Sequence, residues 1–151
     1  GKIEDIFNHR GLTASNHAAG NAACIEATID YLKKPFSGLC FTNLVDTDMV
    51  YGHRRDTRGY ADALEAFDAI MALLGDEDLL LITADHGCDP TFRGTDHTRE
   101  MVPLVVWHRG LQKAVDLGTR QTFADVAATV AEFFGLEERF QAKSFLGEME
   151  G

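Results

Sequence analysis

The sequence predicts an α/β fold in which short strands alternate with amphipathic helices. Two observations support this class: apolar runs of strand length end in polar loops, and the segments between them carry apolar residues at helical spacing. Alternation of this kind is typical of a sheet with parallel members and helices on its faces. The chain has 151 residues, so we expect a single domain over residues 1–151 with a substantial core.

The N-terminal part predicts two helices and a strand. Residues 3–8 have the pattern of a short helix that ends near Gly11, and residues 20–33 carry apolar side chains at i+4 spacing, which indicates a longer helix. Residues 38–45, GLCFTNLV, are apolar and rich in β-prone side chains, so they predict a buried strand.

The clearest helix follows the polar stretch at residues 46–58. Its apolar face recurs at i, i+4, i+7, i+11 and i+14, and consists of Tyr60, Leu64, Phe67, Met71 and Leu74. Asp56 or Thr57 can cap the start of this helix, and Gly75 can end it.

The remaining segments predict two more strands and a final helix. Residues 79–84 and 102–107 are apolar runs of strand length. A helical stripe of apolar residues covers residues 122–134, where Thr122 and Asp125 resemble a capping box and Gly135 closes the helix.

Composition argues against several classes of function. The formal net charge is -10, which disfavours binding of nucleic acid across a broad basic face. No apolar run approaches the roughly 20 residues that a membrane span needs, and no signal peptide is visible. Cys24, Cys40 and Cys88 lack CxxC spacing, so we expect a reducing, cytoplasmic location and interpret Cys88 as a small packed side chain.

The most informative residues lie directly after the second predicted strand. Asp85 and His86 follow the run LLLIT, and Gly87 allows the chain to leave the strand so that both side chains can reach one metal ion. The alternative interpretation is a capping aspartate beside a surface imidazole. His97, eleven residues after His86, is either a third ligand or a surface imidazole paired with Asp96.

A second pair of candidate ligands follows the first predicted strand. It consists of Asp48 and His53, with Asp46 as an alternative to Asp48. Because the carboxyl ends of parallel strands meet at one rim of a sheet, we expect the two pairs to lie close together. Paired carboxylate and imidazole ligands predict a phosphoryl-transfer site for two divalent ions, with manganese, magnesium, zinc or iron as candidates.

The predicted site lacks some of the groups that its chemistry needs. Two ions at such a site take about six protein ligands, and the sequence offers five. No serine or threonine is marked as an activated nucleophile. Arg54, Arg55 and Arg99 flank the ligands and either hold phosphate or pair with local carboxylates.

The chain resembles phosphopentomutases of the alkaline phosphatase superfamily. It contains, in that family's order, the strings GKIEDIF, NLVDTDMVYGHRRD, ITADHGCDPTFRGTDHTRE and VPLVVW, and the resemblance covers essentially the whole chain. The resemblance implies a three-layer sandwich with a mostly parallel sheet. It also implies an enzyme that interconverts ribose or deoxyribose 1-phosphate and 5-phosphate through a phosphothreonine and a bisphosphate intermediate.

The same resemblance implies roles for individual residues. One manganese ion would be bound by Asp48, His53 and His97, and the other by Asp85 and His86. Lys2 would contact the phosphate of the pentose phosphate substrate. Magnesium or zinc in place of manganese is compatible with these ligands.

The family contains further parts that these strings do not include. They are an N-terminal half with the nucleophilic threonine and one more metal-binding aspartate, and an inserted cap domain. We therefore interpret the chain as a C-terminal part of the enzyme, a partial alkaline-phosphatase-like core without the N-terminal half and the cap. We expect it to be inactive by itself because it contains no catalytic nucleophile.

Three other functions fit parts of this pattern. A related metal-dependent phosphatase would keep the metal ligands and change the substrate. Cofactor-independent phosphoglycerate mutases are similar around ADHG but lack the strings GHRRD and GTDHTRE. A non-catalytic module would keep the fold and bind metal without turnover.

Overall fold

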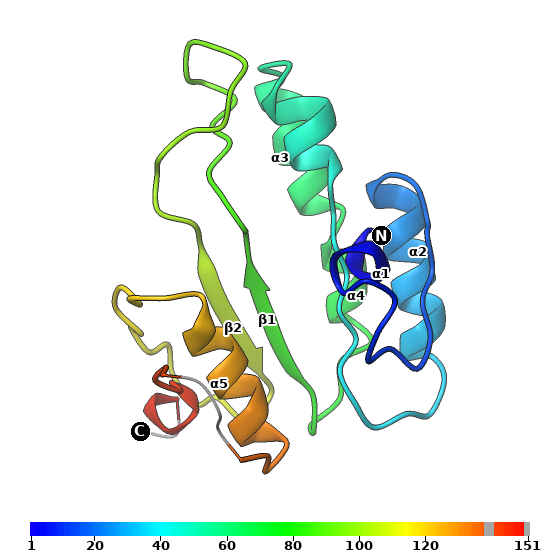
Figure 1. Ribbon diagram of the computed structural model, residues 1–151, viewed down its shortest axis with the longest axis vertical. Coiled ribbons are helices and arrows are strands. Elements are labelled where there is room, and N and C mark those ends of the chain that lie inside the picture. The colour runs from blue at the N-terminus through cyan, green and yellow to red at the C-terminus, as the bar shows by residue number, and fades with distance from the viewer. Residues whose placement is uncertain (138–140, 150–151) are drawn as a thin grey trace. The chain divides into compact units, whose positions relative to one another are not determined.

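Helices and a small sheet make up the computed structural model, which describes residues 1–137 and 141–149 (Figure 1). The α/β class predicted from the sequence is confirmed. The chain divides into two compact units, Gly1–Val106 and Trp107–Gly151. Within the described ranges, no helix has both the length and the apolar composition needed to cross a membrane.

The first unit contains most of the helices. They are α1 (Ile3–Ile6), α2 (Asn21–Leu32), the π-helical turn η1 (Thr47–Gly52), α3 (Thr57–Glu65) and α4 (Asp68–Met71). The helices expected at residues 3–8 and 20–33 are confirmed. The single helix expected after residue 57 is instead divided into α3 and α4. At the break, the Phe67 amide donates to the Leu64 carbonyl three residues back, which interrupts the i→i−4 hydrogen-bond ladder.

One predicted strand is absent, which corrects the expectation for residues 38–45. These residues pair with no strand in the described parts of the chain, where the sheet consists of β1 and β2 alone. The side chains of Leu39 and Phe41 are exposed. A strand forms only where a neighbour completes its backbone hydrogen bonds, so an apolar β-prone run does not become one by itself.

The two remaining strands form as predicted. They are β1 (Leu79–Thr83) and β2 (Leu104–His108), which are hydrogen-bonded neighbours and run in opposite directions in Figure 1. The long connection between them leaves β1 at the ADHG motif and is itself closed by an antiparallel bridge between Gly87 and Thr98. This bridge brings the two histidine-bearing ends of the connection together.

A reciprocal pair of hydrogen bonds fixes η1 beside the start of α2. The Asn21 amide donates to Asp46 Oδ2 at 2.7 Å, and the Asp46 amide donates to Asn21 Oδ1 at 2.9 Å. Asp46 therefore satisfies one of the free amides at the N-terminus of α2 from a distant part of the sequence. In addition, α2 packs against α4, and η1 packs against α3.

The second unit is organised around α5 (Ala124–Phe133) and the short helix η2 (Leu146–Glu148). Thr129 and Phe145 are the largest fully buried side chains among its described residues. Thr129 Oγ1 donates to the Asp125 carbonyl at 2.8 Å and accepts from the Phe145 amide at 3.1 Å. This hydroxyl therefore joins α5 to the segment that leads into η2.

The helix expected at residues 122–134 is confirmed, but its capping box is not formed. Thr122 Oγ1 accepts from the Ala124 amide at 3.2 Å. The carboxylate of Asp125 is turned elsewhere: it accepts from the Lys143 amide at 2.9 Å and lies 3.5 Å from Arg120 Nε. The predicted cap is wrong because a buried ion pair uses the carboxylate that the cap requires. Gly135 does end the helix, at φ +64°.

We predict that Thr129→Val destabilises the protein by about 1–3 kcal/mol, because it leaves the buried Phe145 amide without an acceptor. Thr122→Val is the matched control: it also removes one accepted hydrogen bond, but at an exposed site where water replaces it, at a cost of about 0.5–1 kcal/mol. Urea unfolding followed by circular dichroism measures both. Equal losses would show that the Thr129 hydroxyl does not hold this unit together.

Candidate metal centre

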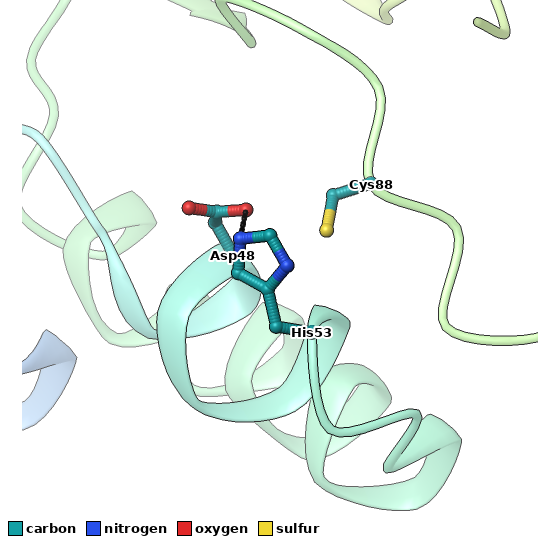
Figure 2. Close-up of side chains that lie close together, drawn as sticks. All are labelled: Asp48, His53 and Cys88. Carbon is teal, nitrogen blue, oxygen red and sulfur yellow. Dashed lines mark ion pairs between the residues drawn. The ribbon is translucent and has the colours of Figure 1, made fainter. Parts of the chain in front are cut away.

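The π-helical turn η1 places Asp48 and His53 on one side of the chain. The His53 amide donates to the Asp48 carbonyl at 3.1 Å, five residues back, which is the hydrogen bond that defines a π turn. The wider turn brings the two side chains face to face, with His53 Nε2 3.3 Å from Asp48 Oδ1 (Figure 2). Part of the polar stretch at residues 46–58 is therefore a ligand-bearing helical turn.

The connection after β1 brings two more histidines to the same aspartate. His97 Nε2 also lies 3.3 Å from Asp48 Oδ1. Nitrogens of His86 and His97 and a carboxylate oxygen of Asp48 all lie within 4.8 Å of one another. The imidazoles of His86 and His97 stack with ring centroids 3.7 Å apart. Four of the five ligands predicted from the sequence are thus brought together from two distant segments.

Hydrogen bonding orients two of these imidazoles. His53 Nδ1 contacts the carbonyl oxygen of Thr95, which can only accept, so Nδ1 carries the proton. In the neutral ring Nε2 then turns an unprotonated lone pair toward Asp48 Oδ1. His86 is oriented in the same way, because its Nδ1 donates to the Gly87 carbonyl at 3.1 Å. A histidine whose second nitrogen is tied to a carbonyl is typical of metal ligands.

The buried oxygen of Asp48 fits a bound cation. Asp48 Oδ1 is inaccessible to solvent and accepts no hydrogen bond from the described residues. A buried carboxylate oxygen that accepts no hydrogen bond is unfavourable unless positive charge lies beside it. Ligand atoms about 2.1 Å from one ion stand about 3.0–3.5 Å apart, and the two observed separations of 3.3 Å fall in that range.

Asp85 stands apart from this cluster. Its side chain is 84% exposed, and its carboxylate faces His86, with Asp85 Oδ1 3.7 Å from His86 Nε2. Of these two neighbours, only His86 belongs to a group of donor atoms with Asp48. The alternative ligand Asp46 is also outside the cluster, because its carboxylate binds the start of α2.

Cys88 joins the cluster on the other side of Asp48. Its sulfur, a carboxylate oxygen of Asp48 and a nitrogen of His53 lie within 4.8 Å of one another (Figure 2). Burial, with the neighbouring Asp48 carboxylate, raises the pKa of the Cys88 thiol to about 11. Burial also raises the pKa of Tyr60, with Cys88 as the next contributor. The sequence predicts a packing role for Cys88, although its position two residues after His86 is a signal for a place in the cluster.

Lys2 lies next to the ligand-bearing turn. Its Nζ donates to Met49 Sδ at 3.3 Å, one residue beyond Asp48. The segment that carries Lys2 is held by Glu4, whose carboxylate accepts from Ser15 Oγ and contacts His17 Nε2 at 2.7 Å. These contacts hold the pKa of Glu4 at about 2, with the Ser15 hydrogen bond as the largest cause. An ammonium group is thus available beside the cluster.

Chemically, the cluster offers one carboxylate oxygen, up to three imidazole nitrogens and one thiol. Oxygen and nitrogen donors in this mixture suit divalent ions such as manganese, zinc, iron and magnesium. A divalent ion in such a site can act as a Lewis acid toward phosphoryl oxygens.

Comparison with known proteins also indicates a metalloenzyme. The family model of the metalloenzyme superfamily matches residues 2–138. The phosphopentomutase of Acetivibrio thermocellus is 52% identical to the chain, and that of Herpetosiphon aurantiacus is 51% identical, each over 99% of the chain and 39% of the relative. The phosphopentomutase of Caldanaerobacter subterraneus subsp. tengcongensis is 54% identical over the same shares.

These matches confirm the resemblance to phosphopentomutases that the four sequence strings indicate. The chain spans about two fifths of the length of the curated relatives it matches, at 39% of each. The family model, in contrast, covers most of the chain. The chain therefore belongs to the metalloenzyme superfamily.

Proposed function

We propose that this chain forms part of the core of a phosphopentomutase, which interconverts the 1-phosphate and 5-phosphate of ribose or deoxyribose. Relatives of that name, about half identical over nearly the whole chain, support the proposal. The observation that carries it is the buried Asp48 Oδ1, which faces the Nε2 atoms of His53 and His97 at 3.3 Å. A carboxylate in this position is suited to bind a cation. Divalent cations assist the transfer of phosphate between sugar positions.

The proposed ligand sets follow the resemblance to the family. One ion is held by Asp48, His53 and His97, which agrees with the convergence of their side chains on Oδ1. The other is held by Asp85 and His86, and manganese is the proposed metal at both positions. When bound, these ions supply Lewis-acid stabilisation to the phosphoryl oxygens as negative charge shifts during transfer.

The chain's own residues contribute positioning and charge. The Thr95 and Gly87 carbonyls hold His53 and His86 in fixed orientations, so their Nε2 atoms need no rearrangement to act as ligands. The Lys2 ammonium is proposed to bind the phosphate of the substrate, because it lies beside η1 and carries a positive charge toward it. These groups are proposed to orient the phosphate relative to the metal centre. Holding the reacting groups in a fixed geometry lowers the barrier to phosphate transfer.

The phosphothreonine step is proposed to involve parts of the enzyme that this chain does not span. The relatives extend well beyond the matched 39% of their length. We propose that this remainder contributes the nucleophilic threonine, the remaining metal ligand and the contacts that distinguish ribose from deoxyribose. A cytoplasmic location is part of the same proposal.

The proposed centre predicts that Asp48→Asn weakens manganese binding by at least about 10–100-fold, because the amide oxygen carries no charge to balance the ion. Asp30→Asn is the control: it makes the same chemical change at an exposed position on α2. Titration of the purified chain with manganese, with elemental analysis of the bound metal, measures both. Undiminished binding by Asp48→Asn would remove the first ion from the proposal.

The proposed activity predicts that His86→Ala lowers the rate of ribose 1-phosphate isomerisation by more than about 100-fold in the complete enzyme, through loss of a metal ligand. His108→Ala, which lies outside the cluster on β2, should keep the rate. A coupled assay for ribose 5-phosphate, run with a phosphate-release assay, makes the measurement. Phosphate release without isomerisation would indicate a phosphatase, and an unaffected His86→Ala enzyme would exclude the proposed role.

The isolated 151-residue chain is predicted to have no mutase activity, because the threonine that accepts the phosphoryl group is proposed to lie outside it. The same assay, applied to the purified chain with manganese and a trace of sugar bisphosphate, tests this. Isomerisation by the pure chain would show that it contains its own phosphoryl acceptor.

A further inference from the structure

We infer that Cys88 completes a thiolate-containing site, with Asp48 and His53, for a borderline-soft divalent cation such as zinc or cadmium. This inference rests on the metal centre proposed above and goes beyond its ligands, which contain no sulfur. It concerns which ions compete for the centre rather than how phosphate is transferred.

The geometry of three donor atoms supports this site. The Cys88 sulfur, a carboxylate oxygen of Asp48 and a nitrogen of His53 are mutually within 4.8 Å. Asp48 lies in η1 and His53 directly follows it, whereas Cys88 lies in the connection after β1 (Figure 2). The carboxylate oxygen between them accepts no hydrogen bond from the described residues, so it has a free capacity for a cation.

Gly52 leaves the space that the sulfur occupies. This glycine is buried at the end of η1, and a Cβ added there would collide with Cys88 Sγ and lie 2.7 Å from the Thr47 carbonyl oxygen. A side chain at this position would force the sulfur or the turn to move. The absence of a side chain at Gly52 therefore leaves room for the thiol beside the two metal ligands.

A thiolate changes the ions that this position prefers. Sulfur ligands favour zinc and softer ions, whereas oxygen ligands suit manganese and magnesium. On binding, the S–H bond of Cys88 breaks, its electron pair forms the bond to the cation, and the proton passes to the buffer. The cation itself is neither oxidised nor reduced.

This site shares Asp48 with the other group of candidate ligands. The same aspartate belongs to the group with Cys88 and His53 and to the group with His86 and His97. A zinc or cadmium ion held by Cys88 therefore occupies donors that the proposed manganese ion requires. The expected consequence is competition between the two kinds of ion for one position.

The test is binding of cadmium, used alone as a probe, to the complete protein that contains this chain. Wild-type protein should show a sulfur-to-cadmium charge-transfer band in the ultraviolet. Cys88→Ser should abolish the contribution of this site to the band and weaken cadmium binding by at least about tenfold, with manganese affinity unchanged. Cys40→Ser, which alters an exposed cysteine, is the matched control and should behave as wild type.

The outcomes separate this inference from the proposal beneath it. Manganese binding that depends on Asp48, combined with the same cadmium band and affinity in wild type and Cys88→Ser, would overturn the role of Cys88 and leave the centre intact. Failure of wild-type protein to bind either ion would overturn both. Competition titrations that show cadmium displacing manganese from wild type more readily than from Cys88→Ser would support the site.

Discussion

The candidate site depends on one buried carboxylate oxygen. Asp48 Oδ1 is removed from water, accepts no hydrogen bond from the described residues, and stands 3.3 Å from two imidazole nitrogens. Burying a charged oxygen in this way is unfavourable unless an opposite charge compensates it. A single divalent cation compensates the same oxygen and uses both nitrogens as ligands.

The surrounding structure keeps this arrangement from relaxing. On one side, the reciprocal hydrogen bonds between Asp46 and Asn21 fix the start of η1 to α2. On the other, the bridge between Gly87 and Thr98 closes the connection, and Thr98 Oγ1 accepts from the Asp89 amide at 2.7 Å. Each ligand is therefore mounted on backbone that is itself hydrogen-bonded. Such preorganisation is what distinguishes a metal site from a chance gathering of polar side chains.

The sequence predicts those helices and strands whose formation depends on their own side chains. The periodic helix at residues 20–33 and the apolar runs of β1 and β2 depend mainly on their own side chains, and they form. Residues 38–45 depend on a partner strand, which no local pattern reveals. The π turn was equally invisible, because its five-residue spacing has no signature in apolar periodicity. Cys88 was missed because a contact across segments, the space left by Gly52, decides its position.

Asp85 shows that the two proposed ion positions are not equivalent in this structure. The position at Asp48 has its donors already converged and oriented, so binding there requires little movement. Asp85 is largely exposed, and its carboxylate lies 3.7 Å from His86 Nε2. Among the described residues, no group of three clustered donors includes Asp85. Ordering a free side chain costs conformational entropy, and an ion held by fewer donors gains less in return. The Asp48 position is therefore preorganised by the chain itself, whereas the Asp85 position requires further ligands before it can hold an ion well.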